Sequence, residues 1–271
     1  MNDWTRVNKS NLCPCCNHAD WCLISQDGNA AICMRVQSEY PKQFKSGEIG
    51  YVHRLTSEVR QALPPRRKEE PKPLINAESM LKEWSQKTRP EWLMGFAEQL
   101  GVRTSALMEL RAAWAGSEQA WAFPMRNGEG AVVGIRLRNE GGDKWAVRGS
   151  KQGIFLPFCI PQPVVHICEG PTDTAAALSM GLFAIGRPSC SGGMPDIISA
   201  LRRLKVREAV LIADNDDPGV NGADMLSRHL EIPCCVMTLP CKDVRAFVNN
   251  GGTVEMLDNI TKQMRTICPK K

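Results

Sequence analysis

Residues 161–271 alternate short, nearly all-apolar runs with segments of helical periodicity. The apolar runs predict strands, and the segments between them repeat apolar residues every three or four positions, as helices do. The predicted strands are 163–168, 182–186, 209–214 and 234–239, and the predicted helices are 171–180, 194–204, 220–230, 243–249 and 253–265. Alternation of this kind is typical of a mostly parallel sheet covered by helices on both faces. This region is therefore predicted to be an α/β domain.

The preceding region, residues 74–160, changes its period along its length. It begins with three helical patterns, at 77–87, 90–100 and 104–113. From Trp121 onward the apolar residues recur at every second position, which predicts strands separated by Gly-containing turns. These strands are 121–126, 131–138, 144–149 and 154–157. We expect a mixed α+β subdomain that leads into the α/β domain.

Two shorter zones precede these regions. Residues 1–53 are rich in cysteine and contain Gly and Asn at intervals, which predicts a small separate domain. Residues 54–73 contain four prolines, with six basic and three acidic residues. Because proline disrupts helix interiors and sheet ladders, this segment is predicted to be a basic, semi-rigid linker.

The composition fits a globular protein of 271 residues, with 43% hydrophobic and 23% charged residues and a net charge of +5. No apolar run approaches the ~20 residues of a membrane-spanning helix, and the polar N-terminus has no signal-peptide core. Twelve cysteines in such a chain indicate a reducing, cytoplasmic compartment and metal binding, not a disulfide framework.

Five of these cysteines lie within the first 33 residues. A C-x2-C pair followed by two more cysteines can supply the tetrahedral sulfur ligands that zinc prefers, and a closed site of this kind is structural. The predicted ligands are Cys13, Cys16, Cys22 and Cys33. Cys15 and His18 are left over, and His18 could replace one sulfur. The alternative is a set of unrelated thiols in a reduced protein.

Carboxylates cluster after two of the predicted strands. Glu169 and Asp173 follow the first strand of the α/β domain, and Asp214 and Asp216 follow the third. Ligands of such sheets bind at the carboxyl ends of the strands, so the two clusters should face one crevice. Asp214 and Asp216, two apart in extended chain, are expected to point the same way. Converging carboxylates favour Mg2+, although each alone is equally typical of helix caps and turns. Lys242 and Asp243, after the fourth strand, are weaker additions to the same edge.

A basic hairpin is predicted upstream of the carboxylates. If the strands pair around the turn 139–143, Ile135 and Leu137 share one face with apolar residues of the second strand. The opposite face then carries Arg136, Arg138, Lys144 and Arg148. That stripe suits template phosphates or a nucleoside triphosphate, although Lys and Arg also occupy ordinary solvated strand faces.

The carboxylate pattern resembles the signature of the Toprim domain. The signature is Glu-Gly-x-x-Asp after one strand, here from Glu169 to Asp173, and Asp-x-Asp-x-x-Gly after another, here from Asp214 to Gly219. That domain occurs in DnaG-type and phage primases, in topoisomerases, in OLD-type nucleases and in RecR-like recombination proteins. The motif pair is specific for the domain and not for the activity.

The order of the domains is similar to that of phage and plasmid primases, including the primase half of primase–helicases. An N-terminal zinc ribbon, a linker, a segment like 121–157 and then a Toprim domain cover nearly the whole chain. This resemblance implies a DNA primase, a nucleotidyltransferase that makes short RNA primers on a single-stranded DNA template from ribonucleoside triphosphates.

The resemblance also implies roles for the carboxylates. Glu169 would be a metal ligand or a general base near the attacking 3′-hydroxyl, and Asp214 and Asp216 would hold catalytic Mg2+ (or Mn2+), supported by Asp173. Two departures stand out. The zinc ligands have unequal gaps of five and ten residues, and Val-Arg follows Asp243 where many relatives have a further Asp or Asn. The role of Asp243 is therefore open.

Two other function classes use similar parts. A Toprim nuclease would use the same carboxylates to cleave DNA, and a non-enzymatic adaptor of the recombination-mediator type would use the zinc and Toprim domains for partner contacts. A topoisomerase needs a nucleophilic tyrosine, and both tyrosines, Tyr40 and Tyr51, lie in the cysteine-rich zone. Since the sequence has no Walker A motif, a replicative helicase in a primosome is expected from another chain.

Overall fold

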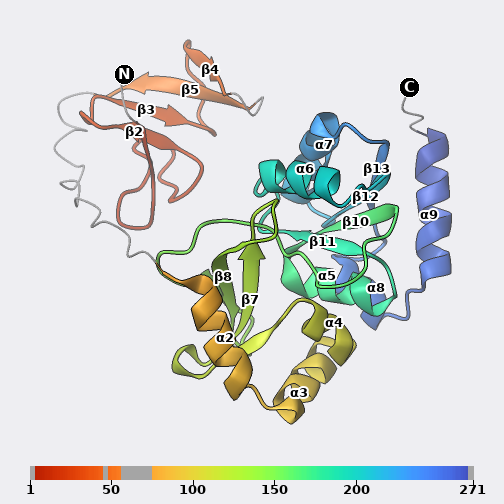
Figure 1. The fold of residues 1–271 in the computed structure, drawn as a ribbon. Coiled ribbons are helices and arrows are strands. Elements are labelled where there is room, and N and C mark those ends of the chain that lie inside the picture. Colours follow the sequence, from red (N-terminus) through yellow and green to blue (C-terminus); the bar gives the residue numbers. More distant parts are fainter. Residues whose placement is uncertain (1–3, 45–47, 56–74, 268–271) are drawn as a thin grey trace. The chain divides into compact units, whose positions relative to one another are not determined.

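The computed structural model describes residues 4–44, 48–55 and 75–267 (Figure 1). Its internal contacts divide the chain into two compact units, residues 1–70 and 71–271, which are treated separately below. The predicted linker, 54–73, lies almost entirely outside the described residues. Among the helices that the structure describes, none combines the length and apolar character needed to cross a membrane.

The first unit contains an antiparallel sheet of five short strands in the order β1-β2-β3-β5-β4. Their bounds are Trp4–Arg6 (β1), Leu23–Ser25 (β2), Ala30–Cys33 (β3), Pro41–Gln43 (β4) and Ile49–Arg54 (β5). The apolar core beneath the sheet is small, and three cysteines are buried in it beside Val7 and Ile24. A core of this size gives limited stability without a covalent or metal crosslink.

The second unit begins with three helices, α2 (Ala77–Lys87), α3 (Pro90–Leu100) and α4 (Thr104–Glu109). The Asn76 side chain caps α2 by accepting a hydrogen bond from the Ser79 amide, and α3 begins at Pro90, a residue suited to the first helical position. The bounds predicted for α2 and α3 are correct. The predicted helix 104–113 is too long, because Arg111 takes a positive φ of 54° and the chain turns into a strand.

An antiparallel sheet in the order β6-β7-β8-β9 follows. Its strands are Ala113–Ala115 (β6), Ala120–Arg126 (β7), Val132–Arg138 (β8) and Lys144–Ala146 (β9). Between β6 and β7 lies one 3-10 turn, Gly116–Glu118. Strand β6 was not predicted, whereas the hairpin turn 139–143 is confirmed, with Arg138 opposite Lys144.

The C-terminal sheet is parallel, in the order β11-β10-β12-β13, as the alternating pattern predicted. Its strands are Val164–Glu169 (β10), Ala184–Arg187 (β11), Glu208–Ala213 (β12) and Cys234–Thr238 (β13). The helices are Gly170–Ser179 (α5), Met194–Arg203 (α6), Asp217–His229 (α7), Val244–Asn249 (α8) and Val254–Ile267 (α9). Separate apolar clusters form the core on its two faces.

The two sheets of the second unit are joined by the segment 154–155. This segment was predicted to be a strand, but it forms only two isolated bridges: Ile154 pairs with Arg126 of β7, and Phe155 pairs with Gly186 of β11. Phe155 is also buried in the same apolar cluster as residues of α3, α4, β7 and the parallel sheet. The segment therefore joins the antiparallel sheet to β11, the edge strand of the parallel sheet.

Candidate metal centre and active site

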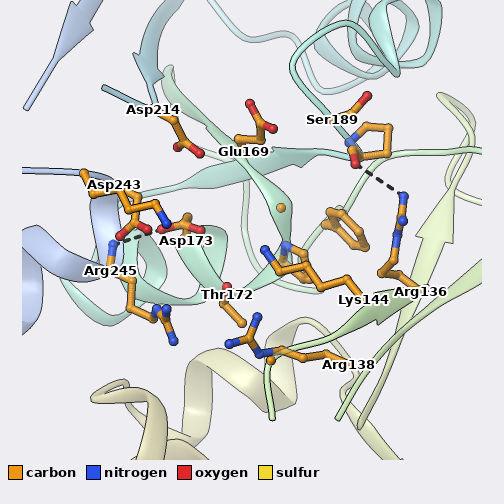
Figure 2. A pocket seen from close by; sticks show the side chains of 16 residues that line it. Arg136, Arg138, Lys144, Glu169, Thr172, Asp173, Ser189, Asp214, Asp243 and Arg245 are labelled. Carbon is orange, nitrogen blue, oxygen red and sulfur yellow. Dashed lines mark hydrogen bonds between the residues drawn. The ribbon is translucent and has the colours of Figure 1, made fainter. Parts of the chain in front are cut away.

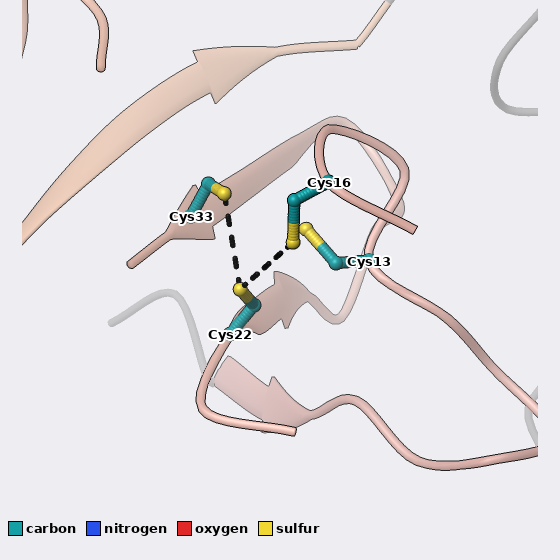
Figure 3. A group of neighbouring side chains, drawn as sticks. All are labelled: Cys13, Cys16, Cys22 and Cys33. Atoms are coloured by element: carbon teal, nitrogen blue, oxygen red, sulfur yellow. Dashed lines mark hydrogen bonds between the residues drawn. The ribbon is translucent and has the colours of Figure 1, made fainter. Parts of the chain in front are cut away.

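The four predicted zinc ligands lie together in the first unit (Figure 3). The sulfur atoms of Cys13, Cys16, Cys22 and Cys33 are all within 4.8 Å of one another. The Sγ–Sγ distances are 3.7 Å from Cys16 to Cys22 and 3.8 Å from Cys22 to Cys33. Zinc–sulfur bonds of ~2.3 Å in a tetrahedron place the sulfurs about 3.8 Å apart. The cluster therefore has the dimensions of a structural zinc site with four thiolate ligands.

The two spare residues are not part of this group. The His18 ring is turned to the backbone, with Nδ1 2.7 Å from the Cys16 carbonyl oxygen. Burial, followed by repulsion from neighbouring thiols, raises the pKa of Cys15 to about 12, which disfavours a thiolate there. Of the potential ligands near the cluster, the four predicted cysteines are the ones that converge.

Hydrogen-bond donors surround the sulfurs. The backbone N–H of Met34 donates to Cys22 Sγ at 3.4 Å, and that of Val36 donates to Cys33 Sγ at 3.2 Å. The Arg35 guanidinium lies 3.9 Å from Cys22 Sγ and is held by the Asp20 carboxylate at 2.7 Å. Such donors stabilise metal-bound thiolates by offsetting their negative charge. Sequence reasoning did not identify Arg35, because nothing in its spacing links it to the cysteines.

A cavity of about 360 Å³ lies in the second unit, between the carboxyl edge of the parallel sheet and the β8–β9 hairpin (Figure 2). Four carboxylates line it: Glu169, Asp173, Asp214 and Asp243. They come from the end of β10, the first turn of α5, the residue after β12 and the residue before α8. These side chains thus lie at the shared sheet edge that was expected from the sequence.

Asp216 differs from this group. The backbone from Asp214 to Asp216 is not extended as expected, since the Asp216 amide donates to the Asp214 carbonyl at 2.8 Å and closes a tight turn. The Asp216 side chain then caps α7 by accepting a hydrogen bond from the Gly219 amide at 2.7 Å. Among the described residues, Asp216 is outside the lining of the cavity, although its charge acts on Glu169 and Asp214.

Two glycines allow the carboxylates to reach the cavity. Gly170 has a φ of +79°, a left-handed conformation that turns the chain from β10 directly into α5. Gly219 is needed for a different reason, since a Cβ there would lie 2.6 Å from the Asp214 carbonyl oxygen. The glycines of both sequence motifs therefore bring backbone segments together beside the acidic residues.

The carboxylates raise one another's pKa. Burial and repulsion from Asp173 and Glu169 raise the pKa of Asp214 to about 7. Burial and repulsion from Asp243 raise the pKa of Asp173 to about 6. Burial also raises the pKa of Glu169, while the Arg187 guanidinium 4.0 Å away opposes that rise. This accumulation of negative charge is the electrostatic setting that a divalent cation relieves.

Glu169 provides a second observation that fits a cation site. Its Oε2 atom is buried and accepts no hydrogen bond from the part of the chain that the structure describes. The carboxylate oxygens do not converge as the four sulfurs do, because the cysteine group is the only set of three or more described ligand side chains that approach this closely. An open arrangement suits Mg2+, which keeps several waters and binds few protein oxygens.

The basic hairpin supplies the opposite wall. Arg136, Arg138 and Lys144 line the cavity, as the predicted face requires. The Arg136 guanidinium donates to the Pro188 carbonyl at 3.3 Å and so ties β8 to the loop after β11. Arg148, the fourth predicted basic residue, lies in the turn after β9 and outside the cavity lining.

Several lining residues were not among the predicted site residues. Thr172, Ser189 and Arg245 also line the cavity, as does Lys242, which the sequence offered only as a weaker addition. Asp243, whose role was open, caps α8 by accepting a hydrogen bond from the Ala246 amide at 2.7 Å. The Arg245 amide donates to Asp173 Oδ1 at 3.0 Å. The position of Thr172, Ser189 and Arg245 after strands of the same sheet could have indicated a place at the cavity. Their residue types alone did not indicate one.

Solved structures with this fold include several primases. A primase from Aquifex aeolicus comprising zinc-binding and RNA polymerase domains matches with a TM-score of 0.55 and 13% identity, over 96% of this chain and 80% of that one. The primase fragment of the bacteriophage T7 primase-helicase matches with a TM-score of 0.51 and 14% identity, over 93% and 97%. A DnaG catalytic domain bound to single-stranded DNA matches with a TM-score of 0.55 and 14% identity, over 69% and 79%.

The sequence comparisons, in contrast, find no match to a protein-family model and no match to a curated protein. The structural matches include both the four-cysteine region and the second unit. The expected Toprim-like architecture is borne out by the parallel sheet with its helices. The chain therefore has the fold of DnaG-type and phage primase cores, with an N-terminal four-cysteine sheet, an antiparallel sheet and a Toprim-like C-terminal sheet.

Proposed function

We propose that this protein is a DNA primase that synthesises short RNA primers on single-stranded DNA by nucleotidyl transfer. The observation that carries the proposal is the cavity in which four carboxylates face a basic hairpin at the carboxyl edge of the parallel sheet. Nucleotidyl transfer needs opposite charges in close proximity: acidic groups to hold divalent cations, and basic groups to hold phosphates. The primase fold supports the same activity.

The acidic residues would hold Mg2+ or Mn2+ and position the reacting oxygens. Bound divalent cations stabilise the attacking and leaving oxygens of such a displacement. Asp214 and Asp173 supply negative charge at the cavity, and Glu169 presents Oε2, which accepts no hydrogen bond within the described residues and lies 4.0 Å from the Arg187 guanidinium, for a metal or for the proton of the attacking hydroxyl. Asp216 contributes charge and holds the turn that orients Asp214.

The basic residues would bind the nucleotide and the template. Arg138 and Lys144 face the carboxylates and would neutralise the triphosphate, while Arg148, in the turn after β9, would contact the template backbone. The first unit, with zinc bound to Cys13, Cys16, Cys22 and Cys33, would also engage the template. A replicative helicase supplied by another chain is the expected partner, in the cytoplasm of a bacterial cell or a phage-infected host.

A primer-synthesis assay tests the proposal. Purified full-length protein, single-stranded DNA of mixed sequence, Mg2+ and labelled ribonucleotides are analysed on a denaturing gel. Wild type should yield short products, and Asp214→Asn should yield none while it remains folded, because the substitution removes a cavity charge without changing side-chain volume. Asp217→Asn is the matched control, since Asp217 belongs to the same acidic segment but lies outside the cavity lining.

Three results would contradict the proposal. Primer synthesis that persists in Asp214→Asn would remove this residue from the site. Template degradation that depends on Asp214, without any synthesis, would replace the primase with the nuclease alternative. DNA binding without either reaction, in the presence of a helicase, would favour the adaptor alternative.

A further inference from the structure

Arg138 and Arg245 both line the cavity, apart from the carboxylates that follow β10 and β12. Arg138 ends β8, and Arg245 is the second residue of α8. Figure 2 shows their guanidinium groups turned toward one another, with the Thr172 side chain beside them. Thr172 is buried and also lines the cavity. Three polar side chains from three elements that are distant in the sequence thus share one wall.

Neither arginine side chain forms an ion pair or a hydrogen bond within the described parts of the chain: neither guanidinium has a carboxylate oxygen within 4.0 Å, and neither donates a side-chain hydrogen bond. Arg187 and Arg136, the neighbouring arginines of the same region, contrast with them: Arg187 donates to the Cys190 carbonyl at 2.7 Å, and Arg136 donates to the Pro188 carbonyl. Arg138 and Arg245 therefore keep their donors directed at the cavity.

The charge distribution favours an anion between the two guanidinium groups. Burial and then repulsion by Arg245 lower the pKa of Arg138, while Asp173 and Asp243 oppose that effect. An anion placed between two partly buried, unpaired arginines relieves the repulsion and accepts their hydrogen bonds.

An alternative role for Arg245, as a counter-ion for Asp173 and Asp243, explains the geometry less well than an anion site does. Asp173 already accepts the Arg245 backbone amide at 3.0 Å, and Asp243 accepts the Ala246 amide at 2.7 Å. The nearby carboxylates are thus hydrogen-bonded by the backbone of α8. The Arg245 side chain is left to face the cavity, where it lies across from Arg138.

We propose that Arg138 and Arg245 form a subsite for the terminal phosphates of the incoming nucleoside triphosphate, and that Arg245 makes the site select ligands by polyphosphate length. The inference rests on the proposed function and assigns a direction to the nucleotide. Its β- and γ-phosphates lie at Arg138 and Arg245, and its α-phosphate lies toward Glu169 and Asp214. Planar guanidinium forks suit this task, because each can donate two hydrogen bonds to one phosphate group.

Binding measurements on the full chain test this subsite apart from synthesis. ATP, ADP, AMP and inorganic tripolyphosphate are titrated with Mg2+ into wild type and Arg245→Gln by calorimetry. In Arg245→Gln, the loss of charge-assisted hydrogen bonds should weaken the binding of ATP and of tripolyphosphate roughly 10- to 100-fold. The affinity for AMP should be unchanged, since its one phosphate does not reach Arg245. The loss of affinity for ADP should lie between those for AMP and ATP. Arg138→Gln should reproduce the pattern, and Arg245→Lys should recover part of the loss.

Arg228→Gln is the matched control, because Arg228 forms an exposed ion pair with Asp224 on α7. Thermal melting verifies that each variant is folded. If Arg245→Gln is unfolded, Arg245→Lys replaces it in the comparison. An equal loss for ATP and AMP, or no loss for either, overturns the inference. If wild type makes primers and Arg245→Gln keeps its ATP affinity, only the subsite fails. If wild type makes no primers but binds tripolyphosphate through Arg245, the subsite stands and the proposed function fails.

Discussion

Asp173 and Asp214 are acids whose surroundings favour the protonated form. Their pKa values in the folded protein are about 6 and about 7, against 3.8 for the ordinary side chain. Between pH 3.8 and pH 6 to 7, the folded protein binds more protons than the unfolded chain does. The free energy of unfolding therefore falls as the pH rises through this range. The stabilisation is complete below about pH 4 and is lost as the pH passes through 6 and 7.

This imbalance predicts a pH-dependent melting temperature. In the absence of divalent cations, the melting temperature of the second unit should decrease between pH 5 and pH 8. Asp214→Asn should flatten that decrease, because the variant cannot ionise. Mg2+ should raise the melting temperature more at pH 8 than at pH 5. A melting temperature that rises toward pH 8 without metal, in wild type, would contradict the assigned environment.

The sequence predicted some residues of the cavity better than others. Glu169, Asp173 and Asp214 could be placed because a strand end followed by a motif fixes their position. Asp216 and Arg148 were assigned by alternation in extended chain, which fails where the backbone turns. Arg245 was not identified, because its place at the cavity depends on how α8 packs beside α5, and no local pattern encodes that contact.

Element boundaries follow local chemistry where that chemistry is strong. The bounds of α3 could be predicted because Pro90 and Gly101 mark helix ends in the sequence. The start of α2 is fixed in the structure by the Asn76 cap. Strand β6 is three residues long and too short to show a period. The segment 154–157 has strand-like residues, but whether it enters a sheet or bridges two of them is decided by tertiary packing.

The turn between β12 and α7 gives a prediction at this scale. Gly219→Ala should destabilise the protein by about 1–3 kcal/mol, because the new Cβ would overlap the Asp214 carbonyl. Gly95→Ala is the matched comparison: its Cβ would enter open space within α3 and should stabilise the helix by up to about 1 kcal/mol. Urea unfolding of both variants measures the difference. Equal effects of the two substitutions would contradict the close approach at Gly219.

The whole chain consists of two units with different sources of stability. The first has few buried apolar residues and a cluster of four sulfurs, whereas the second has extensive apolar cores around two sheets. In a small unit of this kind, the free energy of zinc binding supplies much of the free energy of folding. The stability of the first unit should therefore depend on zinc, and that of the second should not.

Cys22→Ser should reduce bound zinc well below one ion per chain and unfold the first unit alone. Cys15→Ser is the control and should keep full zinc, because Cys15 is outside the sulfur cluster. Zinc released by a thiol-reactive reagent and counted with a colorimetric chelator measures the stoichiometry, and amide NMR spectra report which unit unfolds. Loss of zinc in Cys15→Ser, or retention in Cys22→Ser, would revise the ligand set.

The bridging segment 154–155 has a consequence for exchanging parts between proteins. A boundary at residues 160–161 was predicted from sequence, yet Ile154 and Phe155 pair with strands on both sides of it. A chimera that imported only residues 161–271 from a relative would keep the native Phe155 but pair it with a foreign residue in place of Gly186. Exchanges of parts between related proteins should therefore transfer the second unit, residues 71–271, as a whole, with crossovers confined to the stretch before α2.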